Sequence, residues 1–246
     1  MFEKEVRRYL KSNGFETFCP KAVLFDMDGV LYDSMPNHAV SWHQSMATFN
    51  LKMTPEEAYF YEGMRGVETI KLLTKKQWGR EASDEEASRM YEQKSHCFKQ
   101  CSPAPIMRGV HALMEKIKAC GLKIVVVTGS GQKSLLEKLC LDFKGLIHPN
   151  LIVSSFDVKN GKPNPEPYLL GLQKVGIPPY EGIVVENAPL GIRAAVGAKV
   201  FTVAVNTGPL ADALLQEEGA NLIFPTMEAF KDEWEKIPLH YTLHAE

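Results

Sequence analysis

Two aspartates, Asp26 and Asp28, stand two positions apart at the end of an apolar run, in the segment FDMDGVLYDS. A carboxylate can attack phosphorus and form an acyl phosphate, which splits one difficult step into two easier ones. A second carboxylate beside it can protonate the leaving oxygen and later deprotonate the attacking water. Gly29 lets the backbone turn sharply at this point and approach a substrate. Taken alone, the segment is equally compatible with an ordinary turn after a strand.

Two later segments carry groups that suit a phosphoryl substrate. Thr128 ends the apolar run VVVT, so its hydroxyl and the amides of Gly129 and Ser130 could hold phosphoryl oxygens. Lys162 lies in the loop segment GKPNPEPY, and its ammonium would offset the charges that repel when a carboxylate approaches a phosphate. Each segment alone also has a simpler interpretation, as a structural turn and as a solvated lysine.

Glu186 and Asn187 follow a further apolar run, in the segment IVVENAPLG. Mg²⁺ prefers oxygen ligands in octahedral geometry and usually keeps several waters. A side-chain oxygen of Asp26, the main-chain carbonyl of Asp28 and the side-chain oxygen of Asn187 would be a sufficient protein set. Glu186 could then hold a metal-bound water. The alternative for Asn187 is a cap of the helical run that follows it.

The elements around these residues predict how they come together. From residue 107 onward, apolar strand-like runs alternate with helical segments, and KAVLFD is an earlier buried strand. This alternation predicts an α/β fold, with a Rossmann-like parallel sheet core and helices on both faces. Ligands of such sheets bind outside the carboxyl ends of the strands. Because the candidate residues follow strand ends, we expect them to meet at one edge of the sheet.

The domain organisation follows from the same pattern. Residues 35–106 are helical in pattern and interrupt the sheet after its first strand, which predicts an inserted α-helical cap. The predicted core comprises residues 19–34 and 107–246. Residues 1–18 place apolar side chains at four-residue spacing, which predicts an N-terminal helical extension. This extension could pack on the core, contact a second subunit, or remain partly mobile.

Composition limits the class of protein. The 246 residues are 45% hydrophobic and 24% charged with a formal net charge of −2, so no basic surface for nucleic acid is indicated. No apolar run is long enough to cross a bilayer, and the N-terminus lacks the apolar segment of a signal peptide. The five cysteines include no C-x-x-C and suit reduced thiols. We therefore expect a cytoplasmic monomer or homodimer without nucleic-acid or membrane partners.

Together, in this order, the four segments resemble the motif set of the haloacid dehalogenase superfamily, over residues from Lys21 to about Pro225. The FDMDGVLYDS segment, the early cap and the GKPNPEPY loop are similar to its β-phosphoglucomutase-like phosphatase branch. The resemblance implies that Asp26 is phosphorylated, that Asp28 is the acid–base group, and that Mg²⁺ is required. Dehalogenases lack the second aspartate, so Asp28 argues against dehalogenation. Most relatives carry an aspartate at the position of Asn187, so Mg²⁺ should bind somewhat more weakly here.

The predicted substrate-binding residues come from the loop after Thr128 and from the cap: Gly129, Ser130, Gln132, His38, Glu62 and Arg65. A phosphomutase must hold two phosphates. The resemblance places an arginine of the mutase cap at Thr69, and a lysine and an asparagine of a mutase loop at Gly131 and Gln132. A second phosphate without a cationic partner would be held poorly. Hydrolysis is therefore favoured over the phosphomutase reaction.

Glu62 is an unusual residue for a site that binds anions, unless it helps to hold a metal. That fits a small, metal-chelated substrate such as inorganic pyrophosphate, and the GSGQ and ENAPLG segments resemble those of pyrophosphatases in this branch. The expected function is thus hydrolysis of a small phosphorylated metabolite or of pyrophosphate. The alternatives are a β-phosphoglucomutase and, in a different class, a non-catalytic regulatory protein that binds phosphate or Mg²⁺.

Overall fold

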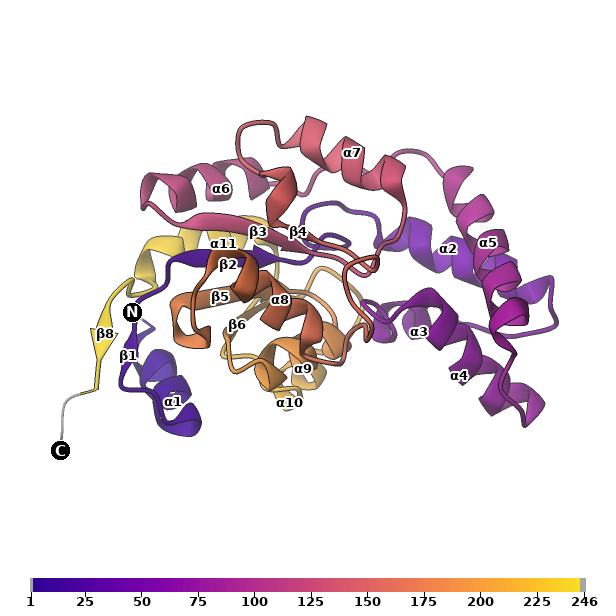
Figure 1. Cartoon of the computed structure of the whole chain (residues 1–246), viewed down its shortest axis with the longest axis horizontal. Helices are drawn as coiled ribbons and strands as arrows, with labels where there is room; N and C mark the ends of the chain where they lie inside the picture. Colours follow the sequence, from indigo (N-terminus) through magenta and orange to yellow (C-terminus); the bar gives the residue numbers. More distant parts are fainter. Residues whose placement is uncertain (1, 244–246) are drawn as a thin grey trace.

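The computed structural model describes residues 2–243. Its central feature is a six-stranded parallel sheet with the strand order β4-β3-β2-β5-β6-β7 (Figure 1). The strands are β2 (Ala22–Phe25), β3 (Lys123–Val127), β4 (Ile152–Val153), β5 (Gly182–Glu186), β6 (Phe201–Val205) and β7 (Leu222–Phe224). The first of them, β2, is central, and the chain adds strands on one side of it and then on the other. This is the strand order of the Rossmann fold, so the predicted fold class is confirmed.

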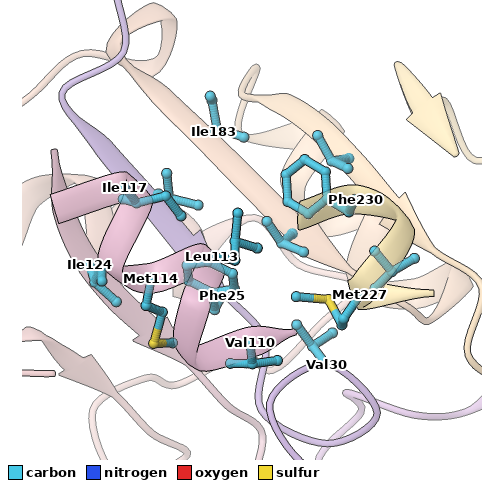
Figure 2. Close-up of a cluster of buried hydrophobic side chains, with 14 of the residues drawn as sticks. Phe25, Val30, Val110, Leu113, Met114, Ile117, Ile124, Ile183, Met227 and Phe230 are labelled. Carbon is cyan, nitrogen blue, oxygen red and sulfur yellow. The ribbon is translucent and has the colours of Figure 1, made fainter. Parts of the chain in front are cut away.

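Helices cover both faces of the sheet, which is why its strands read as uninterrupted apolar runs. On one face lie α6 (Val110–Ala119), α7 (Lys133–Asp142) and α11 (Met227–Glu233), and on the other lie α8 (Glu166–Val175) and α9 (Pro189–Gly197). Side chains of β2 alternate accordingly: Phe25 packs with α6 and α11 (Figure 2), whereas Leu24 packs with α8. The remaining short helices are α10 (Asp212–Glu217) and the 3-10 turns η1 (Pro149–Leu151), η2 (Pro179–Glu181) and η3 (Trp234–Lys236).

Four helices are inserted between β2 and α6: α2 (Met35–Ala47), α3 (Pro55–Phe60), α4 (Gly66–Trp78) and α5 (Asp84–Lys99). They enclose a hydrophobic cluster of their own and extend beyond the carboxyl ends of the strands (Figure 1). Thr54 and Ser83 form capping boxes with Glu57 and Glu86, which fix the first turns of α3 and α5. The insertion therefore has the position expected of a cap over the sheet edge.

The N-terminal helix α1 (Glu3–Asn13) packs on the core through Val6, Tyr9 and Leu10. Behind it, β1 (Thr17–Phe18) pairs antiparallel with β8 (Tyr241–Thr242), so both ends of the described chain lie together. Of the three possibilities for the extension, packing on the core is the one observed. No helix within residues 2–243 is long and apolar enough to span a membrane.

The strand–helix alternation continues beyond β6. A sixth parallel strand, β7, pairs with β6, and α11 then returns across the sheet to pack against α6. The apolar run LIF that forms β7 is only three residues long and follows polar residues. Such a short run has no recognisable period, so its pairing with β6 decides its conformation.

Candidate active site

A buried ionic cluster lies at the carboxyl ends of β2 and β5, where the strand order reverses. The Nζ atom of Lys162 forms an ion pair with Oδ1 of Asp26 and lies 2.6 Å from Oε1 of Glu186 and 3.1 Å from the carbonyl oxygen of Val127. Lys162 is only 1% exposed. Its three donors are thus matched by three oxygens, which fixes the ammonium beside the predicted nucleophile.

Glu186 holds this lysine in place rather than facing outward. Its Oε1 atom accepts from Lys162 and from the Tyr168 hydroxyl at 2.8 Å, and Oε2 accepts from the amides of Asn187 at 2.9 Å and Ala188 at 3.1 Å. A carboxylate has about four acceptor positions, so these four contacts occupy them. The geometry therefore does not support the predicted role of Glu186 in holding a metal-bound water. It assigns Glu186 to positioning Lys162.

Two buried oxygens beside this cluster have no partner. Among the side-chain nitrogen and oxygen atoms buried within residues 2–243, Oδ2 of Asp26 and Oδ1 of Asn187 lack a hydrogen bond. Buried polar atoms are nearly always satisfied, so each exception requires an explanation. Carboxylate and amide oxygens are hard ligands of the kind that Mg²⁺ takes. The two oxygens predicted as metal ligands are thus the ones left without a partner, and they fit a divalent ion.

Gly29 makes the position of Asn187 possible. Its φ of +86° lies in the left-handed region, and a Cβ atom there would lie 2.1 Å from Nδ2 of Asn187. Within the described residues, no group of three or more His, Cys, Asp or Glu side chains could hold a metal. The set inferred here is of another kind, because it combines one aspartate with an asparagine amide and a main-chain carbonyl.

The environment shifts the pKa values of the two aspartates in opposite directions. Burial raises the pKa of Asp26 well above its usual range, and the carboxylates of Glu186 and Asp28 add to this effect against the opposing charge of Lys162. Burial would also raise the pKa of Asp28, but its interaction with His38, the hydrogen bond from the Ser34 hydroxyl and the charge of Lys94 lower it. Asp28 is thus held as a carboxylate, whereas Asp26 lacks a counter-charge at Oδ2.

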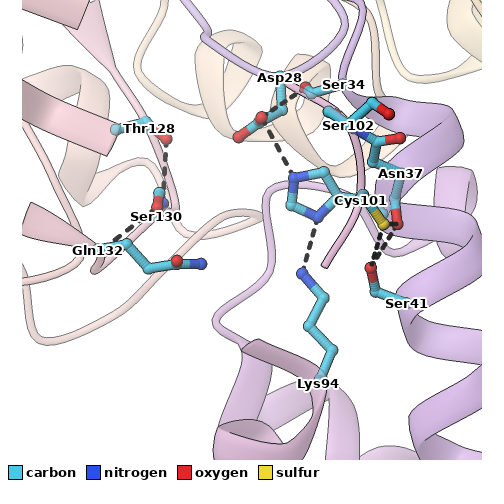
Figure 3. A network of polar contacts seen from close by, with 11 residues as sticks. Asp28, Ser34, Asn37, Ser41, Lys94, Cys101, Ser102, Thr128, Ser130 and Gln132 are labelled. Atoms are coloured by element: carbon cyan, nitrogen blue, oxygen red, sulfur yellow. Dashed lines mark hydrogen bonds and ion pairs between the residues drawn. The ribbon is translucent and has the colours of Figure 1, made fainter. Parts of the chain in front are cut away.

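Asp28 accepts two hydrogen bonds from the start of the cap (Figure 3). The Ser34 hydroxyl donates to its Oδ1 at 2.6 Å, and Nε2 of His38 lies 3.2 Å from the same atom. Ser34 is the N-cap residue of α2, yet its side chain caps no backbone amide, because it is directed to Asp28 instead. The cap therefore contacts the predicted acid–base group directly.

Lys94 is a member of the site that the sequence interpretation missed. It is 2% exposed, and its Nζ atom lies 2.8 Å from Nδ1 of His38 (Figure 3). The ammonium also lies over the rings of Trp42 and Phe98. A signal was present in α5, whose buried positions are Ala87, Met90, Lys94 and Cys97. A lysine on the apolar stripe of an amphipathic helix is rarely buried without a functional or structural partner.

A small cavity of about 30 Å³ lies between cap and core, beside Asp28. With one exception, the predicted substrate-binding residues line it: His38, Glu62, Gly129, Ser130 and Gln132. The amide of Ser130 donates to Oγ1 of Thr128 at 3.0 Å, so it is engaged within the loop rather than directed at a ligand. The expected cradle of amides is thus reduced, and the Thr128 hydroxyl remains as a donor.

The exception is Arg65. Its Nη1 atom donates to the carbonyl oxygen of Lys159 at 2.7 Å, on the core, and Arg65 is not among the residues that line the cavity beside Asp28. In this closed arrangement it forms a cap–core contact and also lines a second small cavity with Thr128 and Lys162, so its predicted role in binding substrate stays a prediction.

Comparison with known proteins agrees with this geometry. Residues 23–205 match the family model of haloacid dehalogenase-like hydrolases. Hexitol phosphatase A of Escherichia coli is 30% identical over 76% of this chain and 83% of its own length. The β-phosphoglucomutase of Bacillus subtilis is 23% identical over 91% of this chain and 99% of its own length.

A solved structure extends the similarity to nearly the whole chain. It belongs to a Bacteroides vulgatus protein assigned provisionally to the β-phosphoglucomutases, with 49% identity, a TM-score of 0.92 and 95% coverage of both chains. The family model alone spans well over half of the sequence, and its range contains the residues assembled around Asp26. The chain therefore belongs to the haloacid dehalogenase-like hydrolase family, and it is an enzyme of the branch that contains β-phosphoglucomutase and related phosphatases.

Proposed function

We propose that this protein is a Mg²⁺-dependent phosphohydrolase that acts through a phosphorylated Asp26. The observation that carries the proposal is the environment of this side chain: one oxygen pairs with the buried Lys162, and the other is without a partner. Oδ1 of Asn187, which follows the neighbouring strand β5, is equally unpartnered. A nucleophilic carboxylate, a fixed cation and two free hard oxygens are what attack on a phosphoryl group requires.

The reaction follows from the positions of the two aspartates. An oxygen of Asp26 forms a bond to phosphorus while the bond to the leaving oxygen breaks. Asp28 takes up a proton from solvent beforehand and gives it to that oxygen. A water molecule then attacks the phosphorus, Asp28 accepts a proton from it, and release of phosphate restores Asp26. Lys162 stays beside the nucleophile and offsets the negative charge that accumulates in both steps.

The metal site is assigned to the free oxygens. Oδ2 of Asp26, Oδ1 of Asn187 and the carbonyl of Asp28 would hold the ion. When bound, Mg²⁺ would neutralise phosphoryl charge and favour the ionised form of Asp26, against the effect of burial on its pKa. Activity should therefore be lost in EDTA and restored by added Mg²⁺.

The substrate is proposed from the relatives and from the cavity. Hexitol phosphatase A and the phosphorylated carbohydrates phosphatase of Thermotoga maritima act, by their names, on phosphorylated sugars. The carboxylate of Glu62 lies on the wall of the cavity beside Asp28, which suits a small substrate that binds together with a metal ion. Small sugar phosphates and inorganic pyrophosphate are thus the substrate candidates.

β-Phosphoglucomutase is the second candidate, because the Bacteroides vulgatus protein shares 49% identity over most of the chain. The cap position that would supply a phosphate-binding arginine is Thr69, which is 1% exposed and bonds to the backbone of Arg65. This position therefore offers no cation to a second phosphate, which favours hydrolysis over the mutase reaction.

Phosphate release distinguishes these candidates. It would be measured with Mg²⁺ and with EDTA, from pyrophosphate, a panel of sugar phosphates and β-glucose 1-phosphate, the last being assayed also for glucose 6-phosphate. Asp26→Asn is the control, since it keeps the shape of the side chain but not its nucleophilic charge. Phosphate release without isomerisation by the native protein, together with no release by Asp26→Asn, supports hydrolysis. Isomerisation faster than release would establish the mutase instead. Turnover that persists in Asp26→Asn would exclude the proposed nucleophile.

A further inference from the structure

We infer that Arg65 is a positioning residue, which keeps the cap closed by bonding to the core loop that carries Lys162. Arg65 is the residue directly before α4, and its Nη1 atom donates to the carbonyl oxygen of Lys159 at 2.7 Å. The two residues are 94 positions apart, one on the inserted helices and one on the core. The same guanidinium lies 3.8 Å from Glu68, a partly exposed neighbour whose ion pair contributes little to stability.

The acceptor lies on a segment that is itself fixed. Oε1 of Glu166, at the start of α8, accepts the amide of Lys159 at 2.7 Å, and Oε2 accepts the backbone and side-chain amides of Asn160 at 3.0 Å and 2.8 Å. Lys162 follows two residues later and pairs with Asp26. Arg65 thus bonds to a segment whose position is set by α8 and which continues directly into the catalytic cluster.

Glycines allow the two loops to approach. A Cβ atom at Gly161 would lie 2.6 Å from Cγ of Arg65, and one at Gly63 would lie 2.8 Å from Cδ of Lys162. Gly161 does not have a positive φ, so the space taken by Arg65, and not backbone strain, explains why a glycine is needed there. The stem of Arg65 therefore packs directly on the core backbone when the cap is closed.

This contact affects the site because of what lies beside it in the cap loop. Glu62 lies three residues before Arg65 and lines the cavity, and its charge reaches Asp28. With Arg65 bonded to Lys159, the cap loop that carries Glu62 is held against the core. Without that bond, the cap loop would be free to move away and admit water to the site. The inference applies to any phosphoryl substrate and goes beyond the proposed function.

The first test is kinetic. Arg65→Met keeps most of the apolar stem and removes the donor. Because a hydrogen bond from a charged group is lost, kcat/KM should fall by about tenfold. The pH dependence of activity should not change, because Arg65 does not touch Asp28 or its partners. Glu68→Gln is the matched control and should stay within about twofold. Activity of Arg65→Met within twofold of the native enzyme would overturn the inference.

The second test uses the close approach at Gly161. Gly161→Ala should lower kcat/KM more than Arg65→Ala does, because its methyl group meets Cγ of Arg65. The double variant Arg65→Ala with Gly161→Ala should recover most of the activity that Gly161→Ala loses relative to Arg65→Ala, since only the 3.3 Å approach of the methyl group to the backbone nitrogen of residue 65 remains. A double variant that is no better than Gly161→Ala alone would show that the two positions do not act through one contact.

The third test does not depend on turnover, so it separates this inference from the proposed function. Small-angle X-ray scattering of the ligand-free native protein should match the closed arrangement, and Arg65→Met should have a larger radius of gyration. Asp26→Asn should scatter like the native protein, because it alters chemistry and not the cap contact. Equal radii for the native protein and Arg65→Met would contradict a role for Arg65 in closure, whatever the substrate is.

Discussion

The Nζ atom of Lys94 lies 2.8 Å from Nδ1 of His38, while the opposite ring nitrogen lies 3.2 Å from Oδ1 of Asp28. An ammonium has only donors, so Nδ1 of His38 must accept, and the ring proton must be on Nε2. That proton is then donated to the carboxylate of Asp28. A buried lysine of the cap thus sets the tautomer of His38 and, through it, the hydrogen bonding of the predicted acid–base residue in the core.

Lys94→Met should lower activity without unfolding the protein. It removes the charged donor, so His38 is no longer held in the tautomer that donates to Asp28. A lost charge-assisted bond of this kind corresponds to about a 10- to 100-fold decrease in kcat/KM. Lys99→Met, on the exposed side of the end of α5, is the control and should have little effect. Equal activity of the two variants would show that Lys94 does not act on Asp28.

The same substitution should raise stability at neutral pH. Burial lowers the pKa of Lys94 from 10.5 to about 8, against the opposing charges of Glu62, Asp28 and Cys101. Because the unfolded chain binds this proton more tightly, charging the buried lysine costs at most roughly 3 kcal/mol below pH 8. The cost falls as pH rises from 8 toward 10.5, where both states are neutral.

Urea unfolding at pH 7 and at pH 10 tests this sign. Lys94→Met should exceed the native protein in free energy of unfolding at pH 7, and the difference should shrink at pH 10. The contact of Lys94 with the rings of Trp42 and Phe98 reduces the gain, because the variant loses it. A difference that grows with pH would contradict a lowered pKa for this group.

The sequence located the reactive groups because they follow strand ends. Asp26, Thr128 and Glu186 each end or follow a buried parallel strand, and the topology alone brings such positions together. Lys94 could not be placed in this way, because it reaches the site from a cap helix whose docking is not encoded in any local pattern. The stripe of buried positions on α5 was a usable signal, but it did not identify His38 as the partner.

The direction in which each side chain points could also not be predicted from the sequence. Glu186 stands beside a predicted metal ligand, yet its two oxygens are bonded to Lys162, Tyr168 and two backbone amides. The amide of Ser130 turns back to Thr128 for a similar reason, since a hydroxyl two residues earlier is the nearest acceptor. These outcomes depend on rotamers and loop closure, which spacing along the chain does not determine.

Gly29→Ala should impair metal binding more than folding. The added methyl group would lie 2.1 Å from Nδ2 of Asn187 and would displace this residue from its place beside Asp26. Gly176→Ala is a matched control, because Gly176 also has a positive φ, of +72°, but nothing lies within 4 Å of the added atom. Both variants should lose about 1 kcal/mol of stability from backbone strain. Only Gly29→Ala should need much more Mg²⁺ for half-maximal activity, and an equal Mg²⁺ requirement would contradict the assignment of Asn187.

Asn187→Asp should bind Mg²⁺ more tightly. The substitution keeps an oxygen at the position that lacks a partner and adds a negative charge near the ion. An added charge of this kind should tighten binding by about tenfold, or about 1.4 kcal/mol. Isothermal titration with Mg²⁺ measures the change directly, without substrate. Unchanged affinity would mean that the oxygen of Asn187 is not a ligand, and Asn187→Leu should bind Mg²⁺ more weakly if it is.

The stability of the ionic cluster around Lys162 should depend strongly on Glu186 and more weakly on Tyr168. Tyr168→Phe removes a single hydrogen bond from a hydroxyl to the Glu186 carboxylate and should cost about 1.5–3 kcal/mol of stability with little effect on turnover. Glu186→Gln removes half of the negative charge that surrounds a fully buried ammonium. Breaking a buried ion pair in this way should cost about 3–5 kcal/mol and move Lys162 away from Asp26, so kcat should fall as well. Urea unfolding and phosphate release measured on both variants test this difference. If Tyr168→Phe and Glu186→Gln lost equal stability and equal activity, Glu186 would be one hydrogen-bond acceptor among several, and the position of Lys162 would depend on the backbone of its loop instead.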